Sequence, residues 1–252
     1  MLPIERRNEI LSKLMLDGRV IVSDLSVQYN VTEETIRRDL EKLEKDGLAK
    51  KTYGGAVRND NLNVDLPYTI RKQTNVEGKK YIAELIGKLI EDGDKVLLDS
   101  STTALYTMKS IYNRNELTVI TNSVEMLMDA PLKNDWRIIS TGGSFSQTSL
   151  SLTGSRAEEV IASYYADKAV ISCKGIDMDH GLTDTSDQNS EVKKAFMKSA
   201  RTVIVGVDST KFDKTSFVRF SDFNNVDVVV TDKDPGEGWK TFFENRGIKL
   251  YY

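Results

Sequence analysis

Short β-branched segments alternate with helical patterns through most of the chain after residue 94. The segments that predict strands are Lys95–Asp99, Leu117–Thr121, Trp136–Thr141, Lys168–Ser172, Thr202–Val207 and Val226–Thr231. Apolar residues at helical spacing predict helices at 102–111, 123–130, 155–165, 189–199 and 237–246. Strands this apolar, separated by helices, are typical of a largely parallel sheet with helices on both faces. The sequence therefore predicts an α/β domain for this part of the chain.

Polar side chains and glycines follow five of the predicted strands. Because ligands of parallel sheets bind outside the carboxyl ends of the strands, these residues are candidates for a ligand site. They are Asp99, Ser100, Ser101, Thr102, Thr103, Thr121, Asn122, Ser123, Gly142, Gly143, Lys174, Gly175, Asp177, Asp208 and Lys211. Hydroxyls and backbone N–H groups at a helix N-terminus bind anions, carboxylates suit sugar hydroxyls, and Lys211 suits a phosphate. Together they indicate a site for a small phosphorylated polyol, although helix caps and tight turns also explain each loop taken singly.

The first sixty residues have a different pattern, in which three short helices precede a hairpin. The first helix is expected to end near Gly18, and a second is expected to follow an N-cap at Ser23. Asn30 can take the left-handed conformation that ends this helix, and Thr32 is the N-cap expected for a third helix. Residues 48–57 are short, alternating and glycine-turned, which predicts a small β-hairpin, or wing. This order predicts a winged helix-turn-helix.

A winged helix-turn-helix with local positive charge favours DNA as its partner. Residues 37–58 contain seven basic and four acidic residues, whereas the whole chain has a net charge of −3. The third helix would enter the major groove with Arg37 and Arg38, and wing lysines would contact phosphates. The candidate DNA-binding residues are Ser23, Thr32, Thr35, Arg37, Arg38, Lys42, Lys50, Lys51 and Tyr53. From these residues alone, a helical protein-interaction module with charged faces is the alternative.

The same segment carries a spaced motif. Arg6, Ile10 and Leu14 are followed after seventeen residues by Thr32, and then by the run Thr35-Ile36-Arg37-Arg38-Asp39-Leu40. This pattern resembles the DeoR-type winged helix-turn-helix of bacterial sugar-metabolism regulators, and residues 48–57 resemble the wing of that family. The resemblance implies that the N-terminal module binds operator DNA.

The resemblance to the DeoR family continues through the rest of the chain. Loops similar to those of its sensor domains are Asp99–Thr103, Thr121–Ser123, Gly142-Gly143, Gly175–Asp177, Gly181–Thr183 and Asp208–Phe212. Ser101 stands where the family usually has glycine, and Lys174 stands where a small residue is commoner. The resemblance implies the fold of ribose-5-phosphate isomerase and of glucosamine-6-phosphate isomerase/deaminase. It also implies a phosphorylated sugar as effector and adds Glu191 to the effector-binding residues.

Composition excludes several other kinds of site. The chain has one cysteine, Cys173, and one histidine, His180, which excludes an intramolecular disulfide and argues against cysteine-based or multi-histidine metal sites. We therefore expect no catalytic residues, no metal and no cofactor. No apolar run is long enough to span a membrane, and no secretory signal is evident. The expectation is a cytoplasmic protein with no membrane partner.

The predicted organisation is a winged helix-turn-helix at 1–57, a linker at 58–75 and an effector-binding sensor domain at 76–252. The expected function is a transcriptional repressor of sugar-metabolism genes, whose operator binding is controlled by a phosphorylated sugar. A homodimer or homotetramer is expected because one winged helix-turn-helix covers one half-site of DNA, and paired copies match repeated half-sites. The alternative is an active sugar-phosphate isomerase tethered to a DNA-binding module, with an acid–base set of Asp177, Glu191 and Lys211. The attached DNA-binding module favours a regulator over an active isomerase.

Overall fold

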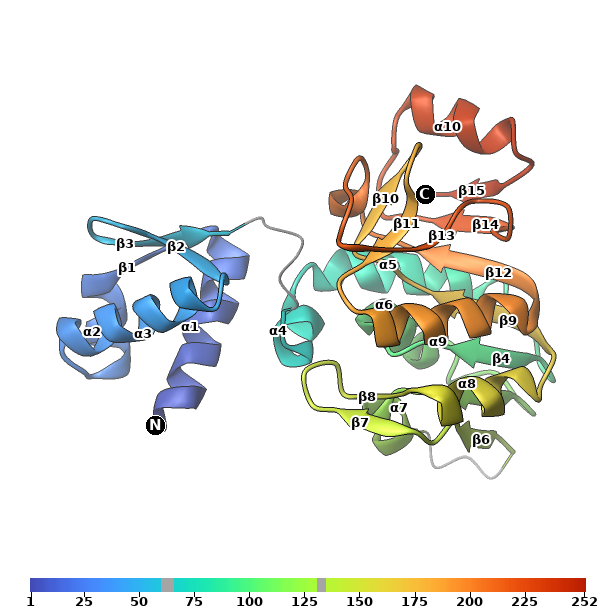
Figure 1. The fold of residues 1–252 in the computed structure, drawn as a ribbon, viewed down its shortest axis with the longest axis horizontal. Coiled ribbons are helices and arrows are strands. Elements are labelled where there is room, and N and C mark those ends of the chain that lie inside the picture. The colour runs from blue at the N-terminus through green and yellow to red at the C-terminus, as the bar shows by residue number, and fades with distance from the viewer. Residues whose placement is uncertain (60–65, 131–134) are drawn as a thin grey trace. The chain divides into compact units, whose positions relative to one another are not determined.

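The chain forms two compact units, Met1–Asn75 and Val76–Tyr252, in the computed structural model (Figure 1). The structure describes residues 1–59, 66–130 and 135–252. The segment expected as a linker, 58–75, contains the helix α4 (Tyr68–Gln73), and the buried side chain of Ile70 joins the core of the first unit. A helix this short is stable only through packing, so α4 is part of the first unit rather than of a linker. Residues 60–65 of that segment lie outside the described residues.

Before α4, the first unit combines three helices with a small antiparallel sheet. Its elements are α1 (Pro3–Asp17), β1 (Arg19–Ile21), α2 (Val22–Tyr29), α3 (Glu33–Lys45), β2 (Ala49–Thr52) and β3 (Gly55–Arg58). The sheet has the strand order β1-β3-β2. This is the predicted helix-turn-helix and wing, with β1 as an additional strand that the sequence analysis did not predict.

The ends of the helices follow the expected capping residues with one exception. Gly18 and Asn30 take left-handed conformations, with φ of 75° and 50°, and Thr32 accepts a hydrogen bond from the Thr35 backbone N–H. Ser23 was expected to be an N-cap, and this was wrong, because the N-cap of α2 is Ile21. The chain passes directly from β1 into α2, which places Ser23 inside the helix.

Apolar side chains of the three helices form the core of the first unit. Ile10 and Leu14 of α1, Leu25 of α2, and Ile36 and Leu40 of α3 are all at most 1% exposed. Full burial of each such side chain stabilises the folded state by about 1.5–3 kcal/mol. This core fixes α2 and α3 against α1 and leaves their polar faces exposed.

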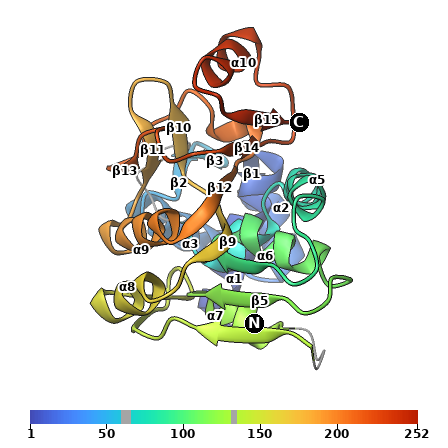
Figure 2. The same cartoon turned by 90° about the vertical axis from the view of Figure 1, so that its right-hand side faces the viewer.

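The second unit is built on a seven-stranded sheet in which every pair of neighbouring strands is parallel (Figures 1 and 2). In spatial order the strands are β15 (Lys249–Tyr251), β14 (Val228–Val230), β12 (Ala200–Gly206), β9 (Ala166–Ile171), β4 (Lys95–Leu98), β5 (Thr118–Thr121) and β6 (Arg137–Ser140). The six predicted strands are all present, and β15 is a seventh. The predicted α/β class is therefore confirmed.

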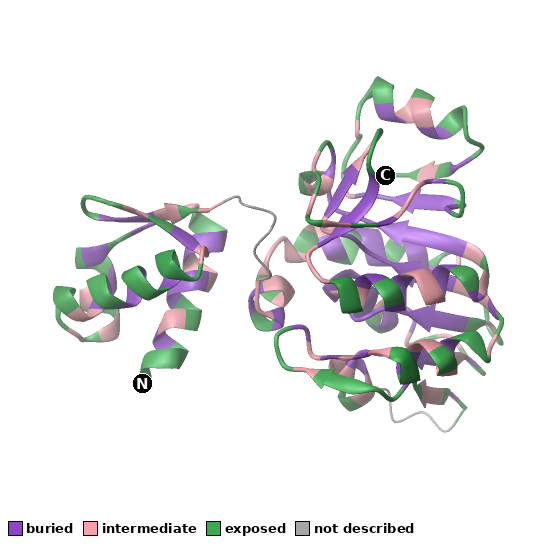
Figure 3. Cartoon of the chain, viewed as in Figure 1, coloured by how far each residue is buried: buried purple, intermediate pink, exposed green. Residues whose placement is uncertain are grey.

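Helices cover both faces of this sheet, as the apolar strands required. They are α5 (Val76–Gly87), α6 (Thr102–Ser110), α7 (Val124–Met128), α8 (Ser155–Ala162), α9 (Asp187–Lys198) and α10 (Glu237–Glu244). Figure 2 shows α5 and α6 on one side of the central strands, with α8 and α9 on the other. The central strands are coloured as buried in Figure 3, which is consistent with a sheet enclosed by two helical layers.

Short strands outside the main sheet were missed by the sequence analysis. One hairpin consists of β7 (Ser144–Ser146) and β8 (Ser151–Thr153), and β10 (Gly175–Asp177), β11 (Gly181–Asp184) and β13 (Val218–Ser221) form a separate antiparallel sheet. Most of these strands have three residues, which is too short for alternation of apolar and polar side chains to be recognised. They extend the loops that follow the main strands, and so they shape the candidate ligand site.

The helices α4 and α5 follow one another closely along the chain and are separated at Thr74-Asn75. Asn75 has φ of 47°, a left-handed conformation that ends one helix before α5 begins at Val76. Asparagine is one of the few residues that takes this conformation readily. The interruption lies at the boundary between the two units.

The wing depends on a glycine that tolerates no side chain. A Cβ at Gly55 would overlap the backbone carbonyl of Val20 on the neighbouring strand, whereas a Cβ at Gly54 would meet no atom within 4 Å. We expect Gly55→Ala to separate β1 from β3 and to lower the stability of the first unit by about 2 kcal/mol, in the range of other overpacked sites. Gly54→Ala is the matched control and should change stability by less than about 0.5 kcal/mol. Calorimetric unfolding tests this, and equal effects of the two substitutions would contradict it.

Candidate functional site

A buried ion pair fixes α3 against α1 in the first unit. The Arg6 Nε lies 2.6 Å from Asp39 Oδ2, and both side chains are less than 10% exposed. Arg7 Nη1 lies 3.5 Å from Asp39 Oδ1, so one carboxylate binds two guanidinium groups. Such charge-assisted hydrogen bonds have a narrow range of geometry. The Asp39 carboxylate therefore sets how α3 is rotated on α1, and which of its residues face outward.

The outward face of α3 carries the predicted DNA-binding cations. Arg37, Arg38 and Lys42 are exposed, and Arg37 and Arg38 pair with glutamates one turn earlier. The hydroxyls of Thr32 and Thr35 lie 2.9 Å apart and belong to the N-cap of the helix. These predicted residues therefore lie along one helix, from its N-cap to Lys42.

The wing adds a second set of predicted residues beside α3. The Lys51 backbone N–H donates to Glu44 Oε1 at 2.8 Å, and Lys51 Nζ lies 2.8 Å from Glu41 Oε1, so β2 is tied to α3. Lys50 is exposed, and Tyr53 is fully exposed at the turn of the hairpin. Ser23 is exposed on α2.

A buried cluster of charges lies at the carboxyl edge of the main sheet in the second unit. Lys193 Nζ, on α9, is 2.6 Å from Asp99 Oδ2, 2.6 Å from the Ser172 carbonyl and 3.5 Å from Asp184 Oδ2. Burial alone would lower the pKa of Lys193, but the Asp99 and Asp184 carboxylates outweigh burial and raise it. The ammonium therefore stays charged and joins the ends of β4, β9 and β11 to α9.

The loops after β4 and β5 carry several hydroxyl groups. Ser101 caps α6 and Ser123 caps α7, through hydrogen bonds of 3.1 and 3.3 Å to backbone N–H groups. Thr121 donates to the Leu98 carbonyl at 2.7 Å and so joins the two strand ends. The predicted residues Ser100, Thr102 and Thr103 are also buried in these loops.

Two buried polar atoms in this region have no hydrogen-bond partner among the described residues. They are Oδ1 of Asn122 and Oγ of Ser190. The amide of Asn122 donates to the Leu152 carbonyl at 3.0 Å, which directs its oxygen away from that strand. A buried polar atom without a partner costs free energy unless a ligand or a water supplies one. The edge of the sheet therefore has unused hydrogen-bonding capacity.

Charged side chains gather around Asp208, where β12 ends. Lys211 Nζ lies 3.8 Å from Asp208 Oδ2, and Lys79 of α5 is a further cation close enough to act on this carboxylate. Burial raises the pKa of Asp208, but Lys211, the Thr210 hydroxyl and Lys79 together outweigh it, so the pKa lies below its ordinary value. The Asp232 carboxylate also lies here, because it accepts from the Ser209 backbone N–H at 2.6 Å, so lysines and carboxylates meet at this end of the edge.

The glycines that were predicted for the site allow close approach of backbones. Gly142 and Gly143 have φ of 63° and 110°, and a Cβ at Gly143 would lie 2.5 Å from the Thr153 carbonyl. A Cβ at Gly175 would overlap the Lys214 carbonyl. Gly143 and Gly175 therefore allow the backbone to pack closely against its neighbours, whereas a Cβ at Gly142 would meet no atom within 4 Å.

The structure does not bring every predicted residue into the cluster. Asp177 lies at the turn of the β10–β11 hairpin, where it accepts from the backbone N–H and from Nδ1 of His180 at 2.9 and 2.7 Å. Glu191 is exposed on α9 and pairs with Lys194 at 2.7 Å. Lys174 is partly buried, and its backbone N–H donates to the Thr183 carbonyl at 2.9 Å.

Sequence reasoning missed Lys193, Asp184 and Lys79, although the sequence contains a signal for two of them. Both lysines are in phase with the buried apolar face of their helix, Lys193 with Phe196 and Lys79 with Ile82. A lysine at a core-facing position of a helix indicates a buried partner of opposite charge. Asp184 has no comparable signal, because only the fold brings β11 to α9.

Two family models match the chain, one over each unit. The first is described as a DeoR-like helix-turn-helix domain and covers residues 6–61, and the second is described as a DeoR C terminal sensor domain and covers residues 74–233. The chain is 36% identical over 250 residues to the uncharacterized HTH-type transcriptional regulator YulB of Bacillus subtilis (strain 168), which is 99% of this chain and 96% of YulB. The chain belongs to the DeoR family of transcriptional regulators.

More distant relatives agree with this family. The glycerol-3-phosphate regulon repressor of Escherichia coli (strain K12) is 29% identical over 231 residues, 92% of this chain and 91% of the repressor. A ribose 5-phosphate isomerase from Methanocaldococcus jannaschii has 18% identity and a TM-score of 0.40 over 55% of each chain, a likeness that says nothing about activity. As a DeoR-family member, the protein is a DNA-binding transcriptional regulator, and an isomerase tethered to DNA is not favoured.

The DeoR motif found in the sequence has a structural explanation. Its first and last charged residues, Arg6 and Asp39, form the buried ion pair, and its aliphatic positions at Ile10, Leu14 and Leu40 form the core. Ile36 is also buried, whereas Thr32, Arg37 and Arg38 of the motif are exposed. The motif therefore combines residues that hold α3 in place with residues that α3 presents.

Neither a membrane span nor a metal site is found in the part of the chain that the structure describes. Over those residues, no helix is long and apolar enough to cross a membrane. The same residues contain no group of three or more histidine, cysteine, aspartate or glutamate side chains able to hold a metal ion.

The Arg6–Asp39 pair predicts a large loss of stability when one partner is removed. Asp39→Ala leaves the Arg6 guanidinium buried without a counter-charge, and we expect the first unit to lose about 3 kcal/mol of unfolding free energy. Asp17→Ala is the control, since its pair with Lys13 is exposed and such pairs contribute less than about 0.5 kcal/mol. Calorimetry of the whole chain measures both, and a similar loss in the two variants would show that the buried pair is not needed.

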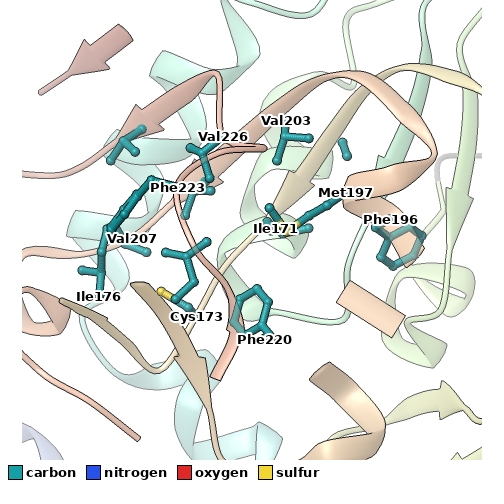
Figure 4. Close-up of a cluster of buried hydrophobic side chains, with 14 of the residues drawn as sticks. Ile171, Cys173, Ile176, Phe196, Met197, Val203, Val207, Phe220, Phe223 and Val226 are labelled. Carbon is teal, nitrogen blue, oxygen red and sulfur yellow. The ribbon is translucent and has the colours of Figure 1, made fainter. Parts of the chain in front are cut away.

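The environment of Cys173 predicts an unreactive thiol. Burial raises its pKa to about 12, and Figure 4 shows the side chain among Ile176, Val207 and Phe220. Because the thiolate is the reactive form, alkylation of the folded protein at pH 8 should be more than about a hundredfold slower than alkylation in urea. Mass spectrometry after a timed iodoacetamide pulse measures both rates, and similar rates would contradict the burial of this side chain.

Proposed function

We propose that this DeoR-family regulator is a repressor of sugar-metabolism genes whose operator binding is controlled by a phosphorylated sugar. The effector binds at the carboxyl edge of the seven-stranded sheet. The observation that carries the proposal is the unused hydrogen-bonding capacity there, namely the buried Asn122 Oδ1 and Ser190 Oγ atoms. Inside a sensor domain, a polyhydroxylated ligand is the class of molecule that best satisfies such atoms.

The distribution of charge supports a phosphorylated ligand. At one end of the edge, Lys211 lies beside Asp208, and its ammonium group suits a phosphate. Ser101–Thr103 at the N-terminus of α6 add hydroxyls and backbone N–H groups of the kind that bind anions. A Cβ at Gly206 would meet Thr103 and Ile82 at 3.1 and 3.2 Å, so α5, α6 and the end of β12 are packed together. The N-terminus of α6 is therefore held in place by its packing against α5 and β12.

The other end of the edge suits the hydroxyls of the sugar. The Asp99 and Asp184 carboxylates bind Lys193 and still have lone pairs that can accept from ligand hydroxyls. Asp177, Glu191, Lys174 and the glycines 142, 143 and 175 remain proposed effector-site residues, of which Asp177 and Glu191 have the weakest support because each is engaged elsewhere. One of the relatives is named as a repressor of the glycerol-3-phosphate regulon, which agrees with a phosphorylated polyol.

For the first unit, we propose that α3 enters the major groove of operator DNA. Arg37 and Arg38 would contact bases or flanking phosphates, while Lys42, Lys50, Lys51 and Tyr53 would contact the backbone. Ser23, Thr32 and Thr35 lie where short hydroxyl side chains can donate to phosphates. One winged helix covers one half-site, so the operator-bound form is a homodimer or homotetramer in the cytoplasm.

Thermal unfolding with pairs of phosphorylated and unphosphorylated sugars tests the effector. A native-state ligand at about 100 times its Kd adds roughly 2.7 kcal/mol, which raises the Tm by a few degrees. We expect a shift with a phosphorylated sugar, a smaller shift with its parent, and loss of most of the shift in Lys211→Ala. Lys198→Ala removes an exposed lysine of the same unit and is the control.

Two results would count against the proposal. The absence of a shift with every phosphorylated sugar would remove this class of effector. Equal shifts for a sugar and its phosphate would remove the phosphate site at Lys211 while leaving a sugar site at Asp99 and Asn122.

A further inference from the structure

Three of the proposed DNA-contacting cations are already paired with glutamates of α3. Arg37 Nη2 lies 2.6 Å from Glu33 Oε2, and Arg38 Nε lies 3.2 Å from Glu34 Oε1. Lys51 Nζ of the wing lies 2.8 Å from Glu41 Oε1, and this contact lowers the pKa of Glu41. These three cations are therefore neutralised in the free protein.

These pairs are not part of the core. The side chains of Arg38 and Glu34 are 75% and 63% exposed, and the other two pairs are partly or fully exposed as well. Exposed ion pairs contribute little to folding stability. An acidic first turn favours the helix dipole, which is a reason for Glu33 and Glu34, but Glu41 lies well beyond that turn. Helix stability therefore does not account for all three glutamates.

Helix α3, which we propose enters the major groove, has no excess of positive charge. Its acids other than Asp39 are Glu33, Glu34, Glu41 and Glu44, and its bases are Arg37, Arg38, Lys42 and Lys45. The acids and bases balance, and Asp39 is occupied by Arg6 and Arg7 in the interior. Non-specific binding to DNA arises almost wholly from attraction between basic residues and phosphates. A balanced helix therefore gains little from DNA of arbitrary sequence.

We propose that Glu33, Glu34 and Glu41 determine selectivity for the operator, by holding the reading cations in ion pairs and by repelling phosphates. Any DNA must break these pairs and bring the carboxylates towards the phosphates of the backbone. An operator compensates with base contacts, such as bidentate acceptors of guanine for arginine and the N4 donor of cytosine for glutamate. Other sequences offer phosphates alone, so they bear the same cost without this compensation.

Glutamine substitutions in the full-length chain test this proposal. Glu33→Gln and Glu34→Gln keep the size and hydrogen-bonding capacity of the side chain but remove its charge. The probes are a random-sequence duplex and an operator selected by the wild-type protein from a duplex library. Affinity for the random duplex should rise about fivefold per substitution, with a smaller gain for the operator, so that the ratio of the two affinities falls. Each arginine released should steepen the dependence of log affinity on log salt by about 0.9.

Two controls distinguish the pairing of specific side chains from a general effect of net charge. Glu159→Gln removes one exposed charge from α8 of the second unit, and an equal gain of affinity in this variant would show an effect of net charge alone. In an Arg37→Ala background, Glu33→Gln should have a much smaller effect, because the pair it breaks is already absent. A full effect in that background overturns the pairing mechanism.

Two further results would also overturn the proposal. Unchanged affinity for the random duplex would show that the glutamates do not oppose non-specific binding. A loss of affinity for the operator alone would show that the glutamates only contact bases. Circular dichroism and unfolding of each variant confirm that α3 still folds, so that a change in affinity refers to charge.

Discussion

The buried Lys193 ammonium is the interaction on which the second unit depends. It binds Asp99 after β4, the Ser172 carbonyl after β9 and Asp184 at the end of β11, and it is carried there by α9. A charge removed from water is stable only with such partners, so these elements must meet at one place. Because all seven strands are parallel, that place is also where their following loops gather. The ion pairs of Lys193 therefore both stabilise the second unit and bring together the loops of the candidate effector site.

The first unit repeats this principle on a smaller scale. Its buried pair, Arg6 with Asp39, joins α1 to α3 and faces inward, while Arg37 and Arg38 on the adjoining positions face outward. A single helical segment of the DeoR motif therefore carries both the buried anchor Asp39 and the exposed arginines that we propose contact DNA. An effector can change operator binding only if it has different affinities for two arrangements of the protein.

Much of this fold follows from local patterns in the sequence. The six strand segments, the caps at Gly18, Asn30 and Thr32, and the order of the helices are all consequences of side-chain periodicity and turn chemistry. Errors arose where short elements depend on distant partners. The β1 strand exists because it pairs with β3, and α4 is held by burial of Ile70 in the first unit. Neither cause can be detected within the segment itself.

For the candidate site, local patterns in the sequence were enough to predict which loops follow the strands, and these loops carry the proposed effector-site residues Asp99, Ser101, Asn122, Asp208 and Lys211. They could not predict which charged groups meet. Glu191 and Lys193 are two residues apart on α9, yet the helix turns one towards solvent and the other into the interior. The folded chain alone brings Asp184 to Lys193 and Lys79 near Asp208. The physical reason is that an ion pair depends on distance in space and on burial, whereas a sequence records only distance along the chain.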